Sequence, residues 1–134
     1  MDSSTRERLI DAAVQARLKA YAPYSNFAVG AAILVKSQEI IRGTNVENAS
    51  YGLTICAERT ATFTAVAKGL TDFEAIAVSV EGGGSPCGAC RQVLREFAPH
   101  LLVLMADADG NLRRETTLDQ LLPDSFGPED LKNS

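Results

Sequence analysis

Three cysteines and one glutamate are the residues of this sequence best suited to chemistry. Cys56 opens the run Cys-Ala-Glu-Arg, and Cys87 and Cys90 share the run Pro-Cys-Gly-Ala-Cys-Arg. Cysteines at this spacing are typical zinc ligands, and a zinc ion with three protein ligands keeps a fourth position open, as catalytic zinc sites do. Glu58 follows Cys56 by two residues, near that position but poorly placed as a ligand. The pattern predicts zinc-assisted hydrolysis in which Glu58 moves protons.

The charged neighbours of the cysteines have competing interpretations. Glu58 could instead stabilise the first turn of a helix, where carboxylates are favoured, although the surrounding cysteines make this the weaker account. Three thiolates leave a zinc site negatively charged, and a guanidinium that donates to a sulfur would offset that charge. The sequence favours Arg59 for this role and leaves Arg91 as the second candidate.

The single histidine, His100, is the other residue that could ligate zinc. It follows Pro99 at the far end of the helix that Cys90 begins, which places it about 15 Å from that cysteine at the rise of an α-helix. We therefore expect His100 to be an ordinary loop residue and the zinc site to keep its open position.

Composition restricts the classes of protein to which the chain can belong. Its 134 residues predict one domain spanning 1–134, and a hydrophobic fraction of 46% suffices for a core. The net charge is -4 with lysines and arginines scattered, so neither nucleic acid nor an anionic membrane is an expected partner. The longest apolar run, 27–35, is too short to span a membrane, and the N-terminus has no apolar signal segment. Cysteines kept free for a metal suit a reducing compartment, which predicts a cytoplasmic protein.

Hydrophobic periodicity predicts the elements that must position these residues. Ser4 and Glu7 form a capping-box pattern at a helix of about 16 residues that ends before Pro23. Further expected helices are 54–68, 88–97 and 118–122, and expected strands are 27–35, 39–47, 73–80, 101–106 and 111–116, with loops at 48–53 and 82–85 and a mostly irregular tail at 123–134. Strands that are apolar on both faces need helices on both sides. The order predicts an α/β fold, a three-layer α/β/α domain with a mixed five-stranded sheet.

These elements place several polar and aromatic residues near the cysteines. The first cysteine would lie in the first turn of helix 54–68 and the other two would open helix 88–97, where the partial positive charge of a helix start favours thiolates. Asn45 and Glu47 end the second expected strand and could grip a hydroxylated ligand, although composition alone indicates only a strand end. Phe27 is most simply a core residue. Phe126, in the irregular tail, either folds back on its own domain or crosses to a neighbour.

The chain resembles the small homotetrameric cytidine deaminases over almost its whole length. The segments that carry the resemblance are 24–32 (Tyr-Ser-Asn-Phe-Ala-Val-Gly-Ala-Ala), 45–51 (Asn-Val-Glu-Asn-Ala-Ser-Tyr), the two cysteine runs and 121–126 (Leu-Leu-Pro-Asp-Ser-Phe). The resemblance implies that Cys56, Cys87 and Cys90 hold one zinc ion and that a water at its fourth position attacks C4 of cytosine. It implies that Glu58 protonates N3 and then helps to protonate the departing amino group. The implied products are uridine and ammonia, which indicates pyrimidine salvage.

The same resemblance implies how the substrate is held. The residues implied to touch it within one subunit are Phe27, Asn45, Glu47, Ala57 and Ser85. Asn45 and Glu47 would bind the ribose, chiefly its 3′-hydroxyl, so that 2′-deoxycytidine is also an expected substrate. The backbone of Ala57 would hold the pyrimidine edge, and the Ser85 carbonyl would face the departing ammonia. The residues implied to reach a neighbouring subunit's site are Ala49, Tyr51 and Phe126, in a homotetramer with shared active sites.

Three alternative functions remain open at this level. A deaminase of a nucleoside antibiotic such as blasticidin S would look similar around zinc, but the segment from Asn45 to Glu47 favours cytidine. A structural zinc module requires a closed metal site, for which the sequence offers no credible fourth ligand. An editing enzyme that acts on a polynucleotide would need clusters of lysine and arginine, which the sequence lacks.

Overall fold

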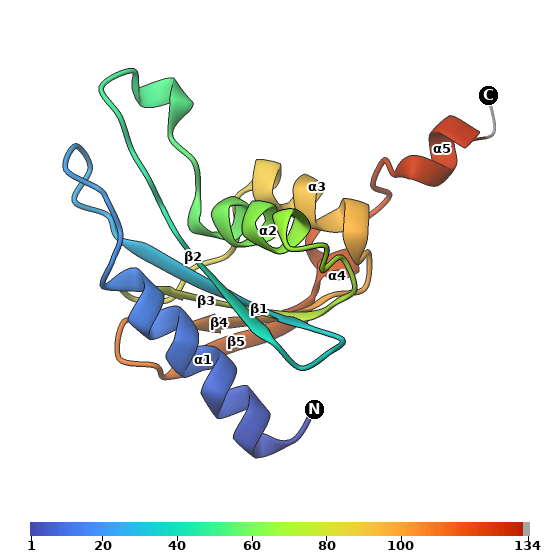
Figure 1. Cartoon of the computed structure of the whole chain (residues 1–134), viewed down its shortest axis with the longest axis horizontal. Helices are drawn as coiled ribbons and strands as arrows, with labels where there is room; N and C mark the ends of the chain where they lie inside the picture. The colour runs from blue at the N-terminus through green and yellow to red at the C-terminus, as the bar shows by residue number, and fades with distance from the viewer. Residues whose placement is uncertain (133–134) are drawn as a thin grey trace.

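The computed structural model describes residues 1–132 and shows a chain in which helices and strands alternate (Figure 1). In chain order the elements are α1 (Ser3–Arg17), β1 (Val29–Val35), β2 (Ile40–Thr44), the 3₁₀ turn η1 (Tyr51–Leu53), α2 (Ala57–Ala67), β3 (Phe73–Val80), α3 (Gly88–Phe97), β4 (Leu102–Ala106), β5 (Leu112–Thr117), α4 (Leu118–Leu121) and α5 (Pro128–Lys132). Each strand and each long helix overlaps a segment that the sequence predicts.

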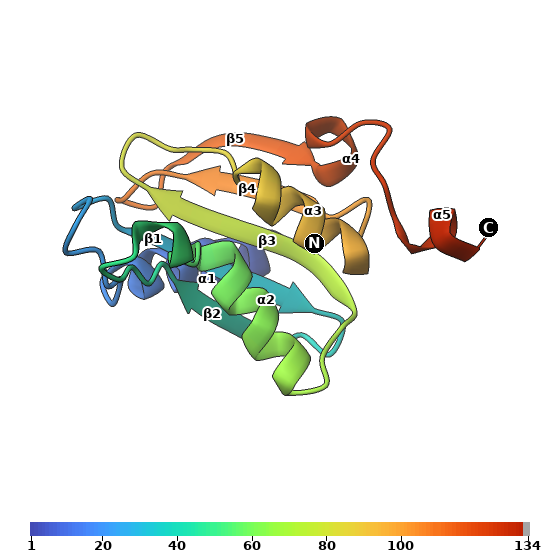
Figure 2. The same ribbon diagram turned by 90° about the horizontal axis from the view of Figure 1, so that it is seen from above.

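The five strands form one mixed sheet in the order β2-β1-β3-β4-β5. β3 and β4 run parallel, and the other neighbouring strands pair antiparallel. α1 covers one face of this sheet, while α2 and α3 lie side by side on the other (Figures 1 and 2). This arrangement confirms the predicted three-layer α/β/α domain with a mixed five-stranded sheet.

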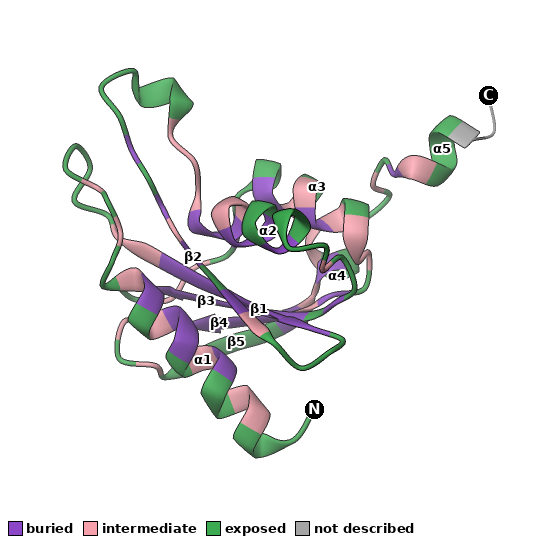
Figure 3. Ribbon diagram, viewed as in Figure 1, coloured by how far each residue is buried: buried purple, intermediate pink, exposed green. Residues whose placement is uncertain are grey.

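The two faces of the sheet are packed with side chains of different size. Beneath α1 the buried cluster is rich in alanine, from α1 itself and from β1 and β3, and comprises Leu9, Ala12, Ala13, Ala32, Leu34, Ala75, Ala77 and Leu104. Beneath α2 and α3 the cluster contains longer and branched side chains such as Ile33, Ile76 and Leu94. The three central strands, β1, β3 and β4, are almost wholly buried, as the two-sided apolar pattern predicts (Figure 3).

Small residues let the start of α2 lie directly on the sheet. A Cβ atom added at Gly43 of β2 would sit 2.4 Å from the carbonyl oxygen of Ala57, the first residue of α2. Ala57, Ala61 and Ala65 follow at four-residue spacing and are fully buried against the sheet. A larger residue at position 43 would displace the helix start, and with it the neighbouring Cys56.

The start of α1 differs from the sequence prediction. The helix begins at Ser3 rather than after a capping box of Ser4 and Glu7. The residue that caps it is Asp2, whose Oδ1 accepts a hydrogen bond of 2.8 Å from the amide of Thr5. An aspartate is as good a cap as a serine, so the helix gains two residues at its start by using Asp2 rather than Ser4.

Several other elements differ from the prediction in their bounds or were not predicted. β1 begins at Val29 and β2 ends at Thr44, so the residues that flank them lie outside the strands. The expected loop 48–53 contains the turn η1, and α2 begins at residue 57 rather than 54. The sequence predicts a mostly irregular tail at 123–134, but residues 128–132 form the helix α5. This helix projects away from the body of the domain (Figure 1). Residues 133 and 134 of the expected tail lie outside the described part of the chain.

The described helices do not include a candidate membrane span. Within residues 1–132, no helix combines the length and the apolar character that a membrane span requires.

Candidate active site

The three cysteines meet where two helices begin. Cys56 is the N-cap residue of α2, Cys87 is the N-cap residue of α3, and Cys90 lies in the first turn of α3. The prediction that Cys56 lies inside the first turn of its helix is wrong, because Cys56 directly precedes the first helical residue, Ala57. The three sulfurs lie within 4.8 Å of one another, with Sγ–Sγ distances of 3.8 Å from Cys56 to Cys87 and 3.3 Å from Cys87 to Cys90. Neither N-cap cysteine uses its side chain to cap its helix, so both sulfurs face the cluster.

His100 does not belong to this cluster. Its side chain is largely exposed and lies 3.7 Å from the carboxylate of Asp119 at the start of α4. Among residues 1–132, the group that can hold a metal consists of the three cysteines alone. The open ligand position that the sequence predicts is therefore compatible with the geometry.

The electrostatics of the cluster favour a thiolate. The pKa of Cys56 is lowered to about 5, chiefly because the Cys90 thiol shares a hydrogen bond with its sulfur and also because Arg59 donates to it. The pKa of Cys90 is raised above its ordinary value by the same hydrogen bond and by burial. A cation that entered between the sulfurs would displace the proton that Cys90 retains, because metal ligation requires thiolates.

Arg59 supplies a test of whether these residues fit zinc. Its Nη2 lies 3.5 Å from the Cys56 sulfur, and the contact raises the pKa of the guanidinium. Its Nε is the buried side-chain nitrogen without a hydrogen-bond partner in the described part of the chain. A buried donor without a partner is costly, and three thiolates around a divalent cation would offer it a negatively charged partner. Three soft ligands and one adjacent guanidinium therefore fit a zinc ion.

Arg91, the second candidate for this contact, points elsewhere. Its guanidinium donates to the carbonyl oxygens of Pro86 and Leu121, at 2.8 and 2.6 Å, and to the hydroxyl of Ser85 at 2.9 Å. The Nε, Nη1 and Nη2 atoms of Arg91 thus each donate to an oxygen atom and not to a sulfur. The geometry favours Arg59 over Arg91 as the arginine beside the thiolates.

Glu58 lies in the first turn of α2, two residues after Cys56, and is 4% exposed. Burial is the main cause that raises its pKa to about 7, and the negative charge of Cys56 acts in the same direction. A carboxyl group with a pKa near neutrality can both accept and release a proton at physiological pH. The raised pKa of Glu58 and its place in the first turn of α2 are compatible with the predicted role in proton transfer.

A cavity of about 300 Å³ is lined by Glu58 together with Cys56 and Cys87. Its lining is Ser25, Phe27, Val29, Asn45, Glu47, Thr54, Cys56, Glu58, Val78, Val80, Gly84, Ser85 and Cys87. Apolar walls with a few convergent polar groups are typical of small-molecule sites. The cavity brings together most of the residues that the sequence implicates, from segments scattered over half of the chain.

The other residues that the sequence implicates are not part of the cavity lining. Ala57 is buried at the start of α2, and Ala49 is exposed in the loop after β2. Tyr51 lies beside Tyr24, with ring centroids 5.4 Å apart, in an adjoining hollow. Phe126 is 57% exposed in the segment between α4 and α5. The prediction that Phe27 is a core residue is wrong, because its side chain is 56% exposed at the cavity.

Asn45 and Glu47 have a structural task that the sequence analysis missed. The Asn45 side chain accepts from the Val29 amide at 2.9 Å and donates to the Phe27 carbonyl at 2.8 Å. The Glu47 carboxylate accepts from the amides of Tyr24 and Ser25, at 3.0 and 3.2 Å, and from the Ser25 hydroxyl. The Ser25 hydroxyl is the largest cause that lowers the Glu47 pKa. These two residues hold the 24–29 segment, and hence Phe27, at the cavity.

The apolar wall residues were also missed. Val29 of β1 pairs directly with Val80 of β3, so the ends of the two strands meet at the cavity. Nothing in the sequence of either strand identifies the other as its partner. The signal that could have identified Val80 is its position at the end of the predicted strand 73–80, which leads to the helix of Cys90.

Comparisons with known proteins agree on one family. The family model described as the cytidine and deoxycytidylate deaminase zinc-binding region matches residues 3–106. A cytidine deaminase of Halalkalibacterium halodurans is 50% identical over 131 residues, which cover 96% of this chain and 98% of that protein. A cytidine deaminase of Mycobacterium tuberculosis is 48% identical over 122 residues, covering 89% of this chain and 87% of that protein.

Solved structures give the same result at the level of the fold. The crystal structure of cytidine deaminase from Burkholderia pseudomallei is 51% identical, with a TM-score of 0.85, over 94% of this chain and 100% of that chain. The corresponding structure from Mycobacterium leprae is 41% identical with a TM-score of 0.77, over 88% of this chain and 97% of that chain. The chain therefore belongs to the cytidine and deoxycytidylate deaminase family.

Proposed function

We propose that this protein is a cytidine deaminase that hydrolyses cytidine, and 2′-deoxycytidine, to the corresponding uridine and ammonia. The observation that carries the proposal is a buried glutamate, Glu58, that shares one cavity with Cys56 and Cys87. Relatives that are about half identical over nearly the whole chain are named cytidine deaminases. A role in pyrimidine salvage follows from this reaction.

Cys56, Cys87 and Cys90 would hold the zinc ion. Zinc, when bound there, supplies a Lewis acid that lowers the pKa of water towards neutrality. Arg59 would offset the negative charge of the thiolates from its position beside the Cys56 sulfur. This division of labour leaves the chemistry of proton transfer to Glu58.

Glu58 would move protons along the edge of the pyrimidine. In the overall reaction a water adds to C4, and the bond between C4 and the amino nitrogen breaks. The Glu58 carboxylate would take the proton that the water loses and give it to N3, and would later carry the proton of the C4 hydroxyl to the departing amino group, so that C4 becomes a carbonyl as ammonia leaves. The buried position of the carboxyl, at the start of α2 beside the cavity, supports this role. The backbone of Ala57 would hold the same edge of the ring.

The remaining cavity residues would hold the nucleoside. Glu47 accepts three hydrogen bonds within the chain, and a carboxylate has about four acceptor sites, so it keeps capacity for a ribose hydroxyl. Asn45 keeps one N–H for the same purpose. Because these contacts address the 3′-hydroxyl, the 2′-deoxynucleoside would also fit. Phe27 would pack against the ligand, and the Ser85 carbonyl would face the departing ammonia.

The active sites would be shared within a homotetramer. Tyr51, Leu53 and Phe126 are large apolar side chains that are 70%, 66% and 57% exposed. Large apolar side chains that one chain leaves exposed are candidates for burial between subunits. Ala49, Tyr51 and Phe126 would then reach the cavity of a neighbouring copy. Nucleic acid is not a proposed partner at a net charge of -4, and three zinc-binding thiolates suit a reducing compartment such as the cytoplasm.

Two measurements on one sample test the proposal. Conversion of cytidine is followed by its ultraviolet absorbance, and zinc is quantified in the same preparation. We expect one zinc per chain and turnover of both cytidine and 2′-deoxycytidine. Blasticidin S serves as the competing substrate. A zinc-loaded protein that leaves cytidine unchanged would contradict the proposed function, and turnover of blasticidin S alone would replace it.

A further inference from the structure

The loop between β3 and α3 forms one wall of the cavity and contains little that could hold it in place. Gly82 and Gly83 have left-handed backbones, with φ of 79° and 78°, and Gly84 follows them. Gly84 and Ser85 line the cavity. One turn hydrogen bond, of 2.9 Å from the Gly83 amide to the Val80 carbonyl, closes the loop. Consecutive glycines have wide conformational freedom, so contacts from other elements must fix this wall.

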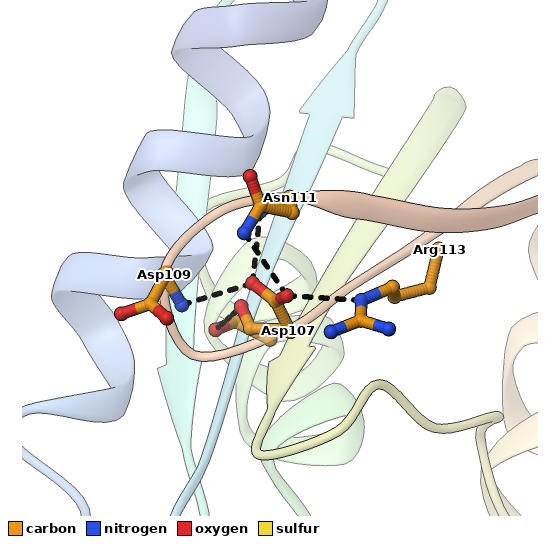
Figure 4. A network of polar contacts seen from close by, with 5 residues as sticks. Asp107, Asp109, Asn111 and Arg113 are labelled. Carbon is orange, nitrogen blue, oxygen red and sulfur yellow. Dashed lines mark hydrogen bonds and ion pairs between the residues drawn. The ribbon is translucent and has the colours of Figure 1, made fainter.

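Arg113 of β5 supports the loop from one side. A Cβ atom added at Gly83 would lie 2.9 Å from the Arg113 Cγ, so the loop backbone rests on the stem of that arginine. The Arg113 Nε donates to the Asp107 carboxylate at 2.9 Å. Asp107 also accepts from the amides of Asp109 and Asn111, at 3.0 and 2.9 Å (Figure 4). This network fixes the first half of the loop but does not touch Ser85.

Arg91 of α3 holds the second half of the loop. Its Nη2 donates to the Ser85 hydroxyl at 2.9 Å and its Nε to the Pro86 carbonyl at 2.8 Å, while its Nη1 reaches the Leu121 carbonyl in α4 at 2.6 Å. A guanidinium is planar and rigid, so three bonds fix the relative positions of all three acceptors. The arginine thus joins the cavity wall, the helix with two of the cysteines, and the segment that leads to the C-terminus.

We propose that Arg91 is a positioning residue that sets the cavity wall at Ser85, through its bonds to Ser85 and to the adjoining Pro86, and couples this wall to the C-terminal segment. It acts through the geometry of its hydrogen bonds and not through charge on the thiolates. The catalytic consequence rests on the proposed function, in which the Ser85 carbonyl faces the departing ammonia. A wall displaced by about 1 Å can cost about 10²-fold in rate.

The kinetic test compares Arg91→Lys with Arg91→Ala in zinc-loaded protein. Lysine keeps the positive charge but cannot make three bonds in one plane. We expect both variants to lower kcat by a similar factor, on the order of 10- to 100-fold, with zinc content unchanged. A Lys variant that retains the wild-type kcat would show that charge is sufficient and would overturn the proposal.

Hydrogen exchange supplies a readout that does not depend on activity. We expect the amides of Gly84, Ser85 and Cys87 to exchange faster in both Arg91 variants. The matched control is Arg95→Ala, because Arg95 lies one turn later on α3 and binds Ser125 and Glu129 instead of the wall. Unchanged wall exchange in the Arg91 variants, or an equal increase in Arg95→Ala, would overturn the proposal.

The two readouts separate this inference from the proposed function. If wild-type protein fails to deaminate cytidine, the proposed function fails, and hydrogen exchange still decides whether Arg91 fixes the wall. If wild-type protein is active and Arg91→Lys matches it in kcat and in exchange, this inference alone fails. Arg91→Lys retains the aliphatic stem, so it keeps the test valid even if Arg91→Ala does not fold.

Discussion

The starts of α2 and α3 look alike in sequence and differ in what they do. Each begins with an N-cap cysteine whose side chain leaves the helix uncapped, and each carries an arginine within its first turn or just beyond. Arg59 contacts the Cys56 sulfur, whereas Arg91 contacts the loop and α4. Arg91 directly follows Cys90, so the helix turns it by about 100° from that cysteine. Under the proposed function, the start of α2 would supply one zinc ligand, the compensating charge and proton transfer, and the start of α3 would supply the other two ligands and a frame.

The largest expected effect tests the chemical role of the start of α2. Glu58→Gln keeps the shape of the side chain but cannot carry the proton. We expect kcat to fall by at least ~10²–10⁴-fold, as for loss of a general acid–base group, while zinc content stays unchanged because no cysteine is altered. Steady-state kinetics with zinc quantification checks this. A zinc-loaded Glu58→Gln protein with near-wild-type kcat would show that Glu58 is not the proton-transfer group.

The next effect distinguishes the two arginines directly. Arg59→Ala removes the donor beside the Cys56 sulfur, and we expect a loss of about 10–100-fold in zinc affinity or activity, as for other groups that support metal ligands. Competition with a chelator measures the zinc affinity. Arg91→Ala is the matched control and should retain zinc as wild type does, because its bonds go to oxygen atoms. Equal zinc loss from both variants would mean that the two helix starts are equivalent.

The fold and the metal cluster could be predicted from sequence because they depend on local patterns. Two-sided apolar strands require helices on both faces, and cysteine spacing indicates a metal site. The contacts of Arg91 could not be predicted, since its partner Leu121 lies 30 residues away in the sequence. The exposure of Phe27 has a similar cause, because the Asn45 side chain pins its carbonyl from 18 residues away. The roles of the individual site residues remain predictions.

A smaller effect concerns the frame that α3 provides to the C-terminal segment. Gln92 of α3 donates to the Phe126 carbonyl at 2.9 Å, which leaves the aromatic ring outward and exposed. If the ring completes a neighbouring site, Phe126→Ala should raise KM several-fold, because aromatic contacts contribute ~0.5–1.5 kcal/mol beyond burial. Sedimentation and kinetics over a range of protein concentration test this. An active wild-type monomer, or an unchanged KM in the variant, would confine the role of α3 to its own subunit.

The smallest effect uses α1 as a reference for an ordinary helix start. Unlike the two cysteines, Asp2 caps its helix, and its bond to the Thr5 amide lowers the Asp2 pKa below the ordinary 3.8. A lowered pKa means that the stabilisation is complete above the ordinary value and is lost as the pH falls through the pKa of the folded protein. Asp2→Ala should therefore lower the urea midpoint slightly at pH near 7, and its difference from wild type should shrink below a pH of about 4.

Asp2→Asn is the control that separates the cap from its charge, because asparagine also accepts the amide bond but does not titrate. Its urea midpoint should stay near that of wild type at neutral pH and exceed that of Asp2→Ala throughout. Zinc content and kcat should be unchanged in both variants, because α1 covers the face of the sheet opposite α2 and α3. Loss of zinc or activity in Asp2→Ala would show that the cysteine cluster depends on helix starts on both faces. The contrast between a capped helix and two metal-binding helix starts would then no longer hold.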